Sequence, residues 1–179
     1  MTLAEYFDTP ETLVPQELIY GALRVADAPF VHHQRAVLSL ALALERHVSG
    51  ERLGEVLVAP VDVVLDAERA LVLQPDLLFV SRARSDIVRD RVYGAPDLVI
   101  EVLSPRPRIG ALNERVEWFA RYGVREIWLY DQAKRRMHVL VCRDGQVVRS
   151  AVLVTSDRVR SGVLPALALA VEQLTAREI

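Results

Sequence analysis

Asp76 and Glu101 are the two residues whose surroundings most clearly predict chemistry. Glu101 lies between Ile100 and Val102, in a run of apolar residues that is typical of a buried β-strand. An ionised carboxylate in such a strand is costly to desolvate, so it needs a cation, a hydrogen-bond partner or a raised pKa. Asp76 follows Pro75 at the start of another predicted strand. We therefore consider the two carboxylates as a pair.

Two carboxylates on adjacent strands can bind one Mg²⁺ ion, because this ion prefers oxygen ligands and keeps several of its waters. The ion would lower the pKa of a bound water and stabilise the charge that develops on a phosphate during cleavage. Two simpler interpretations compete with this one. Glu101 could form a buried ion pair with an arginine. Asp76 could open a turn, as Pro-Asp pairs commonly do.

The helices that must position these residues follow from the spacing of apolar side chains. Residues 30–48 predict a long amphipathic helix, and residues 112–122 predict another that ends at Gly123. Thr9 followed by Pro10 predicts a further helix start near the N-terminus. A short helix over residues 171–174 ends the predicted fold.

Several Val-rich or alternating segments predict strands. These are residues 18–25, 55–59, 61–65, 77–80, 97–104, 127–130, 137–142 and 147–154. Residues 82–91 are charged and predict a surface loop with one helical turn. A mixed central sheet flanked by helices is an α/β (α+β) architecture. No repeat or linker divides the sequence, so we expect one domain of residues 1–179.

The composition is that of a soluble globular protein. Of 179 residues, 51% are hydrophobic and 26% are charged, and Cys142 is the only cysteine, which excludes an intramolecular disulfide and a thiolate metal cluster. A net charge of −2 argues against binding nucleic acid by bulk electrostatics, but it leaves room for a local basic rim. The N-terminus lacks the features of a signal peptide and no apolar stretch is long enough to cross a bilayer, so we expect a cytoplasmic protein without membrane contact.

Five motifs in this chain resemble those of the Uma-type restriction-endonuclease family, which belongs to the PD-(D/E)XK nuclease superfamily. They are ELIYG at residues 17–21, HQR at 33–35, QPDL at 74–77, GAPDLVIEVLSP at 94–105 and YGVREIW at 122–128. The resemblance covers about residues 5–170 and implies a restriction-endonuclease-like core. It also implies that Asp76 and Glu101 are metal ligands, that Glu17 is a third acidic member from the end of an N-terminal helix, and that Ser104 is a supporting polar group.

The sequence departs from the superfamily pattern at the position of the lysine. Leu103 occupies the site two residues after the second acid, where it can neither donate a hydrogen bond nor carry charge. The family usually places its lysine on the following helix, and the alignment puts Arg115 there. Arginine can clamp a phosphate through two hydrogen bonds, but its pKa is too high for it to deprotonate water. Because Lys134 is the only lysine of the chain, a general drift from lysine to arginine competes with loss of activity as the explanation.

Other candidates are weaker. His33 could transfer a proton near the site or bind a metal, although the adjacent His32 shows that a helix start readily collects histidines. The arginines of residues 82–91 could contact phosphate, but the interleaved acidic residues favour a solvated loop. The aromatic residues are better explained as core than as platforms for stacked bases; they are Trp118, Phe119, Trp128 and Tyr130.

The leading prediction is a DNA endonuclease that depends on Mg²⁺ or Mn²⁺ and hydrolyses phosphodiester bonds with an activated water. Its catalytic residues would be Asp76, Glu101, Arg115, Glu17 and His33. Cutting both strands of a duplex usually needs two sites, so a homodimer would suit this activity. The sequence does not indicate which segment would form the interface. One alternative is a catalytically inactive DNA-binding or interaction module that retains the nuclease fold. Another is activity on RNA or a small phosphoester, which the sequence does not distinguish from DNA.

Overall fold

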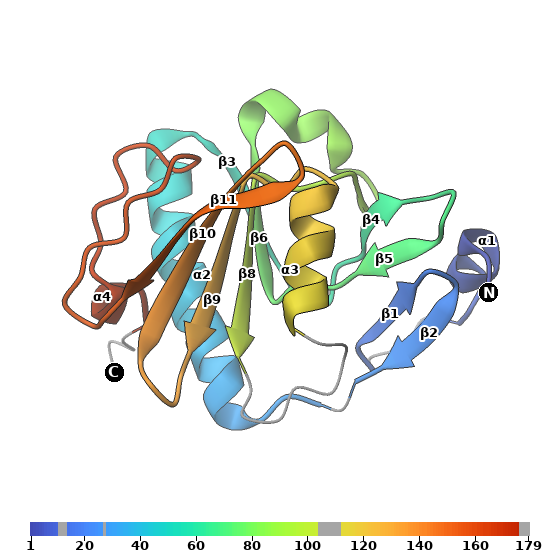
Figure 1. The fold of residues 1–179 in the computed structure, drawn as a ribbon, viewed down its shortest axis with the longest axis horizontal. Helices are drawn as coiled ribbons and strands as arrows, with labels where there is room; N and C mark the ends of the chain where they lie inside the picture. The colour runs from blue at the N-terminus through green and yellow to red at the C-terminus, as the bar shows by residue number, and fades with distance from the viewer. Residues whose placement is uncertain (11–13, 27, 104–111, 176–179) are drawn as a thin grey trace.

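The computed structural model describes residues 1–10, 14–26, 28–103 and 112–175, which form two β-sheets and the helices packed on them (Figure 1). In chain order the elements are α1 (Leu3–Phe7), β1 (Gln16–Ile19), β2 (Ala22–Val25), α2 (Val31–Glu51), β3 (Gly54–Val58), β4 (Val63–Asp66), β5 (Leu71–Leu73), β6 (Leu77–Ser81), the 3₁₀ helix η1 (Arg82–Ile87), β7 (Val92–Tyr93), β8 (Leu98–Leu103), α3 (Leu112–Arg121), β9 (Glu126–Asp131), β10 (Arg136–Arg143), β11 (Gln146–Leu153) and α4 (Val171–Thr175). The predicted mixed α/β architecture is confirmed.

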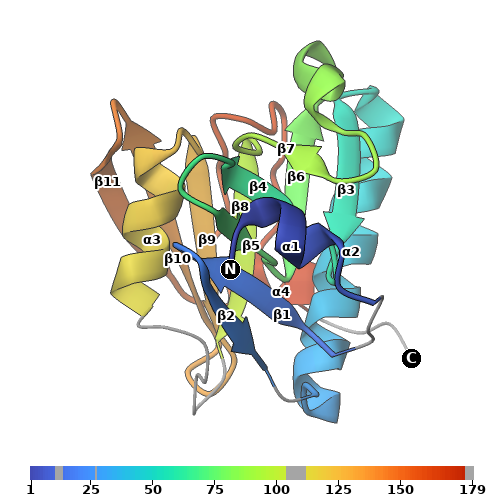
Figure 2. The same ribbon diagram turned by 90° about the vertical axis from the view of Figure 1, so that its right-hand side faces the viewer.

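The larger sheet has six strands in the order β11-β10-β9-β8-β6-β3. Its strand pairs are antiparallel except for β8 and β9, which are parallel and are connected through α3. The views in Figures 1 and 2 place α2 on one face of this sheet and α3 on the other. The sheet is therefore the middle layer, and β8 lies near its centre.

Side chains of β8 alternate between the two faces, as they must in a strand. Ile100 and Val102 belong to the apolar core beneath α2, which also contains Trp128 and Leu40. Val99 instead packs with Phe119 of α3. Glu101 follows the alternation of Val99, so its side chain lies on the α3 face of the sheet.

The smaller sheet has five strands in the order β2-β1-β5-β4-β7. Leu71 and Leu73 of β5 share a core with Phe119 of α3, which fixes this sheet against the same face that carries Glu101. Strand β1 pairs with β5, with Leu18 opposite Val72. The N-terminal segment is thereby brought to the site.

Two predictions for the N-terminal segment were wrong. Residues 18–25 do not form one strand, because Tyr20 and Gly21 adopt positive φ angles of 50° and 84° and turn the chain into the β1–β2 hairpin. The first helix, α1, begins after Thr2, whose hydroxyl accepts a hydrogen bond from the Glu5 amide in a capping box. Thr9 follows that helix, and its hydroxyl donates to the carbonyl oxygen of Tyr6 instead of capping a new helix. Residues 11–13 lie outside the described part of the chain.

The remaining predicted elements are present, with shifts of a few residues at their ends. The sequence analysis missed β5 and β7, which have only three and two residues and so show no periodicity. No helix within the described residues has both the length and the apolar character needed to cross a membrane.

Candidate active site

Asp76 and Glu101 come together because β6 and β8 are antiparallel neighbours. Leu77 pairs with Ile100, so continuing the register by one residue sets Asp76 directly opposite Glu101. Residues opposed in this way have Cβ atoms roughly 4.5–5.5 Å apart and project from the same face of the sheet. In addition, Asp76 Oδ2 accepts a hydrogen bond of 2.7 Å from the Val102 amide. Asp76 therefore does more than open a turn, since it is held against the strand that carries Glu101.

Glu101 lies between the apolar side chains of Val99 and Leu103 and is 13% exposed. This burial raises the pKa of Glu101 to about 7, and the negative charges of Asp76 and Glu17 act in the same direction, while Arg115 opposes them. Near neutral pH the carboxyl group is thus poised between its two protonation states. A cation placed beside it would favour the ionised form.

Arg115 supplies a positive charge from the first turns of α3. Its Nε and Nη2 donate to Glu101 Oε1 at 3.1 Å and 2.5 Å, and its Nη1 donates to both oxygens of Glu17 at 2.8 Å and 2.6 Å. Arg115 is 8% exposed and Glu17 only 1%. Burial alone would lower the pKa of Arg115, but the carboxylates of Glu101 and Glu17 together raise it. The guanidinium is therefore charged and bridges two acids.

Glu17 reaches this cluster from β1 and not from the end of a helix, which corrects the expected position. The Gln74 amide donates to Glu17 Oε1 at 2.7 Å, so the carboxylate has a backbone partner as well as Arg115. The Gln74 side chain in turn donates to Asp62 and accepts from the Gln16 amide. The sequence analysis missed this supporting role of Gln74, whose one signal was its place directly before the Pro75-Asp76 pair.

His33 approaches from the first turn of α2. Its Nε2 lies 3.2 Å from Asp76 Oδ2, and its side chain is 13% exposed. Burial lowers the pKa of His33, but the hydrogen bond to Asp76 and the charges of Asp76 and Glu101 outweigh it, so the pKa is raised overall. The other ring nitrogen, Nδ1, is buried and has no hydrogen-bond partner among the described residues.

One oxygen of each central carboxylate has no hydrogen-bond donor among the residues that the structure describes. Within the described part of the chain, no group donates a hydrogen bond to Asp76 Oδ1 or Glu101 Oε2. The described residues contain no cluster of three or more His, Cys, Asp or Glu side chains arranged to hold a metal. Mg²⁺ is commonly held by one or two carboxylates and several waters, so a two-carboxylate donor set fits that ion.

The other sequence candidates lie away from this cluster or are committed elsewhere. Leu103 packs in the apolar core beside α3. Within the 82–91 segment, Arg84 and Arg91 form ion pairs with Asp97 and Asp62. Phe119, Trp128 and Tyr130 are buried in the core, and Trp118 is partly buried with its ring edge-on to Tyr20. Ser104 lies outside the described residues.

Asp97 is a buried carboxylate that the sequence analysis did not select. It is fully buried, accepts a hydrogen bond of 2.8 Å from the Ser81 amide and forms an ion pair of 2.8 Å with Arg125. Burial would raise the pKa of Asp97, but these partners lower it overall. Since Asp97 precedes β8 and pairs with Ser81 at the far end of β6, it stabilises the β6–β8 register on which the site depends.

Comparisons with known proteins identify the family and the fold. Residues 3–172 match the model of the Uma2 family, described as "Putative restriction endonuclease". A crystal structure of "a putative nuclease belonging to DUF820" from Anabaena variabilis superposes with a TM-score of 0.81 at 19% sequence identity, covering 98% of this chain and 97% of the other. No curated protein matches the sequence. The resemblance seen in the motifs is thus confirmed, and the chain belongs to the Uma2 family of restriction-endonuclease-like proteins.

Proposed function

We propose that this protein is a metal-dependent DNA endonuclease in which Asp76 and Glu101 bind Mg²⁺ or Mn²⁺. The observation that carries the proposal is a pair of oxygens, Asp76 Oδ1 and Glu101 Oε2, that accept no hydrogen bond from the described residues. Asp76 directly precedes β6, and Glu101 lies on the neighbouring strand β8. A bound ion supplies an activated water and offsets the charge that develops on the phosphate. DNA as the substrate is inferred from family membership.

The charge of the cluster also favours a cation. Among the described residues, three carboxylates, from Glu17, Asp76 and Glu101, share the positive charge of Arg115. Even with His33 protonated, the five side chains would carry a net charge of −1 when all three acids are ionised. A divalent ion reverses that sign, which lets an anionic phosphate approach carboxylates that would otherwise repel it.

Arg115 acts in this arrangement as a positioning residue. Its Nε, Nη1 and Nη2 all donate to carboxylates, so the fork is already engaged and is not aimed at a phosphate. By holding Glu101 Oε1, it leaves Oε2 as the oxygen that can bind the ion. Glu17 in turn holds Arg115 through both of its carboxylate oxygens.

His33 holds the other metal-binding carboxylate. Its contact with Asp76 Oδ2, together with the Val102 amide, fixes that oxygen and leaves Oδ1 without a donor among the described residues. Partners of this kind orient metal ligands, and their removal typically lowers metal affinity or activity by 10- to 100-fold, an order-of-magnitude range. We therefore assign His33 to orienting Asp76.

A catalytically inactive DNA-binding module is the second candidate function. The observation that favours it is that Arg115 forms ion pairs with both Glu17 and Glu101 without any metal. Such a protein would bind DNA and leave it intact, whatever ion is supplied. Fold membership alone does not separate the two functions.

Cleavage of supercoiled plasmid by the purified protein separates the two candidates. We expect nicking or linearisation with Mg²⁺ or Mn²⁺ and none with a chelator. Glu101→Gln, which keeps an oxygen for Arg115 but removes the charge, should abolish cleavage. The matched control is Glu114→Gln, on the exposed side of α3, which should cleave as the wild type does. DNA binding without cleavage under all conditions would establish the inactive module instead.

A further inference from the structure

Helix α2 carries an exposed stripe on the side opposite to its buried face. The buried face packs on the large sheet through Leu40, Leu44 and Val48. With about 100° per residue, the side chains of the stripe all project within about 40° of one common direction, on the side of the helix away from that face. The members of the stripe are Val31, Arg35, Leu38, Leu42, Glu45 and Ser49. Figure 2 shows α2 at the outer side of the molecule, with no described strand or helix beyond it.

The apolar members of this stripe are unusually accessible. Val31 is 66% exposed, Leu38 46% and Leu42 53%. Single exposed leucines are common on protein surfaces, but here two lie four residues apart on one face of a helix. The spacing of the whole stripe alternates between four and three residues, which is the spacing at which two helices pack side by side.

The sequence of the stripe is complementary to that of a second, antiparallel copy of the same helix. The midpoint between Leu38 and Leu42 is residue 40, and the midpoint between Arg35 and Glu45 is the same residue. Two copies of α2 packed antiparallel about this point would therefore place each Leu38 against a Leu42. They would also place each Arg35 beside a Glu45 of the other copy.

We infer that a second copy of this chain packs on the stripe, forming a two-fold symmetric dimer through antiparallel α2 helices. A two-fold interface uses the same surface on both copies, and it requires the self-complementary pattern seen here. The charged pair occurs twice, and both pairs flank the central leucines. Arg35 has no ion-pair partner among the described residues, while Glu45 accepts a hydrogen bond from Ser49 in its own helix. Both charges are therefore available to a partner.

The dimer is independent of whether the site cleaves DNA. Its two-fold axis would nevertheless relate the two candidate sites, each of which includes His33 at the start of α2. Symmetric proteins bind duplex DNA by matching their two-fold axis to that of the duplex. The inferred dimer would thus present one site to each strand.

Charge reversal at the two polar positions tests the inference. Sedimentation velocity over a range of concentrations should show the wild type passing from a monomer of 20.1 kDa to twice that mass. Arg35→Glu places two like-charged pairs in the interface, as does Glu45→Arg, so each should raise the dissociation constant at least tenfold. The double variant Arg35→Glu/Glu45→Arg restores opposite charges and should dimerise like the wild type. Arg149→Glu, an exposed change of the same kind on β11, is the control.

Mixing the two single variants gives a second, sharper measurement. In a heterodimer of Arg35→Glu with Glu45→Arg, both charged pairs are again opposite in sign, whereas either variant alone has only repulsive pairs. The mixture should therefore dimerise at concentrations where each variant alone is monomeric. A wild type that is monomeric throughout would overturn the inference. A dimer that both single variants leave unchanged would equally overturn it, because the contact would then lie elsewhere.

Discussion

Replacing Arg115 with alanine should strongly destabilise the fold, because it leaves two buried acids without their shared partner. Arg115 makes two contacts with Glu101 and two with Glu17, at distances between 2.5 Å and 3.1 Å. Glu17 is 1% exposed and would keep, among the described residues, the hydrogen bond from the Gln74 amide alone.

Removing one partner from a buried ion pair costs roughly 3–5 kcal/mol. Two acids lose a partner here, but Glu101, whose pKa is already about 7, can take up a proton and avoid part of the penalty. We therefore expect a loss of about 3–5 kcal/mol at pH 8, equivalent to a melting temperature roughly 6–20 °C lower. Arg115→Lys, which keeps the charge but not the fork, should lose less.

The stability lost in Arg115→Ala should increase with pH. Burial already holds the folded-state pKa of Glu101 above its unfolded value, and loss of Arg115, which opposes this shift, would raise that pKa further. Stability is then greatest at low pH and falls as pH rises toward and through the folded-state pKa. The difference in unfolding free energy between Arg115→Ala and the wild type should accordingly be smaller at pH 5 than at pH 8.

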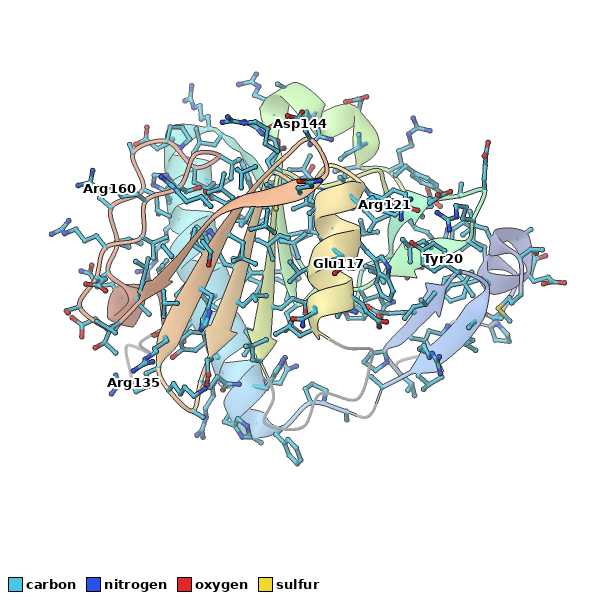
Figure 3. All side chains as sticks on the ribbon, viewed as in Figure 1. Tyr20, Glu117, Arg121, Arg135, Asp144 and Arg160 are labelled. Carbon is cyan, nitrogen blue, oxygen red and sulfur yellow. The ribbon has the colours of Figure 1, made fainter. Side chains whose placement is uncertain are left out.

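Unfolding of the wild type and of Arg115→Ala in guanidinium chloride, at pH 5 and at pH 8, measures this difference in stability. Arg121→Ala, at the exposed C-terminal end of the same helix (Figure 3), controls for the loss of an arginine from α3 and should change stability by less than about 0.5 kcal/mol. A loss below about 1 kcal/mol for Arg115→Ala would contradict the bridging role of Arg115. A difference in stability that is larger at pH 5 than at pH 8 would also contradict it.

Three further predictions concern the site and the strands that position it. Arg115→Lys, which keeps the charge but not the fork, should retain more DNA cleavage than Arg115→Ala, which should lower cleavage at least tenfold, or about 1.4 kcal/mol of transition-state stabilisation; equal rates in plasmid assays of the wild type and both variants would contradict the positioning role of Arg115. Mg²⁺ or Mn²⁺ should raise the melting temperature with concentration by binding the folded state, and Asp76→Asn should abolish that increase; an unchanged response would mean that the ion binds elsewhere. Asp97→Asn should destabilise the protein by roughly 3 kcal/mol near pH 7, because a buried, ion-paired carboxylate is lost. Since the pKa of Asp97 is lowered in the folded state, its contribution is present above its unfolded pKa and lost as pH falls, so denaturation curves of variant and wild type should converge in acid.

The central pair of carboxylates could be predicted from the sequence because both acids stand next to segments that are expected to be buried, where an ionised side chain needs a partner. Glu101 interrupts a run of buried aliphatic residues, and Asp76 opens a strand that such a run must pair with. Arg115 was selected through the resemblance to the family, and the structure brings it into contact with Glu101. The alternative of an ion pair between Glu101 and an arginine is present as well. It uses one oxygen of Glu101 and leaves the other open.

The position of Glu17 could not be predicted in the same way. It is separated from Arg115 by 98 residues, and its contact depends on β1 pairing with β5, a strand of three residues without a recognisable pattern. The β1–β2 hairpin was also hidden, because the turn falls on Tyr20-Gly21 in the middle of a continuous apolar run. Local patterns identify strands well, but long-range pairing decides which strand brings an acid to the site.

Binding of Mn²⁺ in the absence of DNA tests the central claim most directly, because it does not depend on the substrate. Titration followed by electron paramagnetic resonance should show one Mn²⁺ site in the wild type and in the Glu114→Gln control. That site should be lost, or at least tenfold weaker, in both Asp76→Asn and Glu101→Gln. Equal Mn²⁺ binding by all four proteins, or no binding by the wild type, would contradict the assignment of Asp76 and Glu101 as the metal ligands.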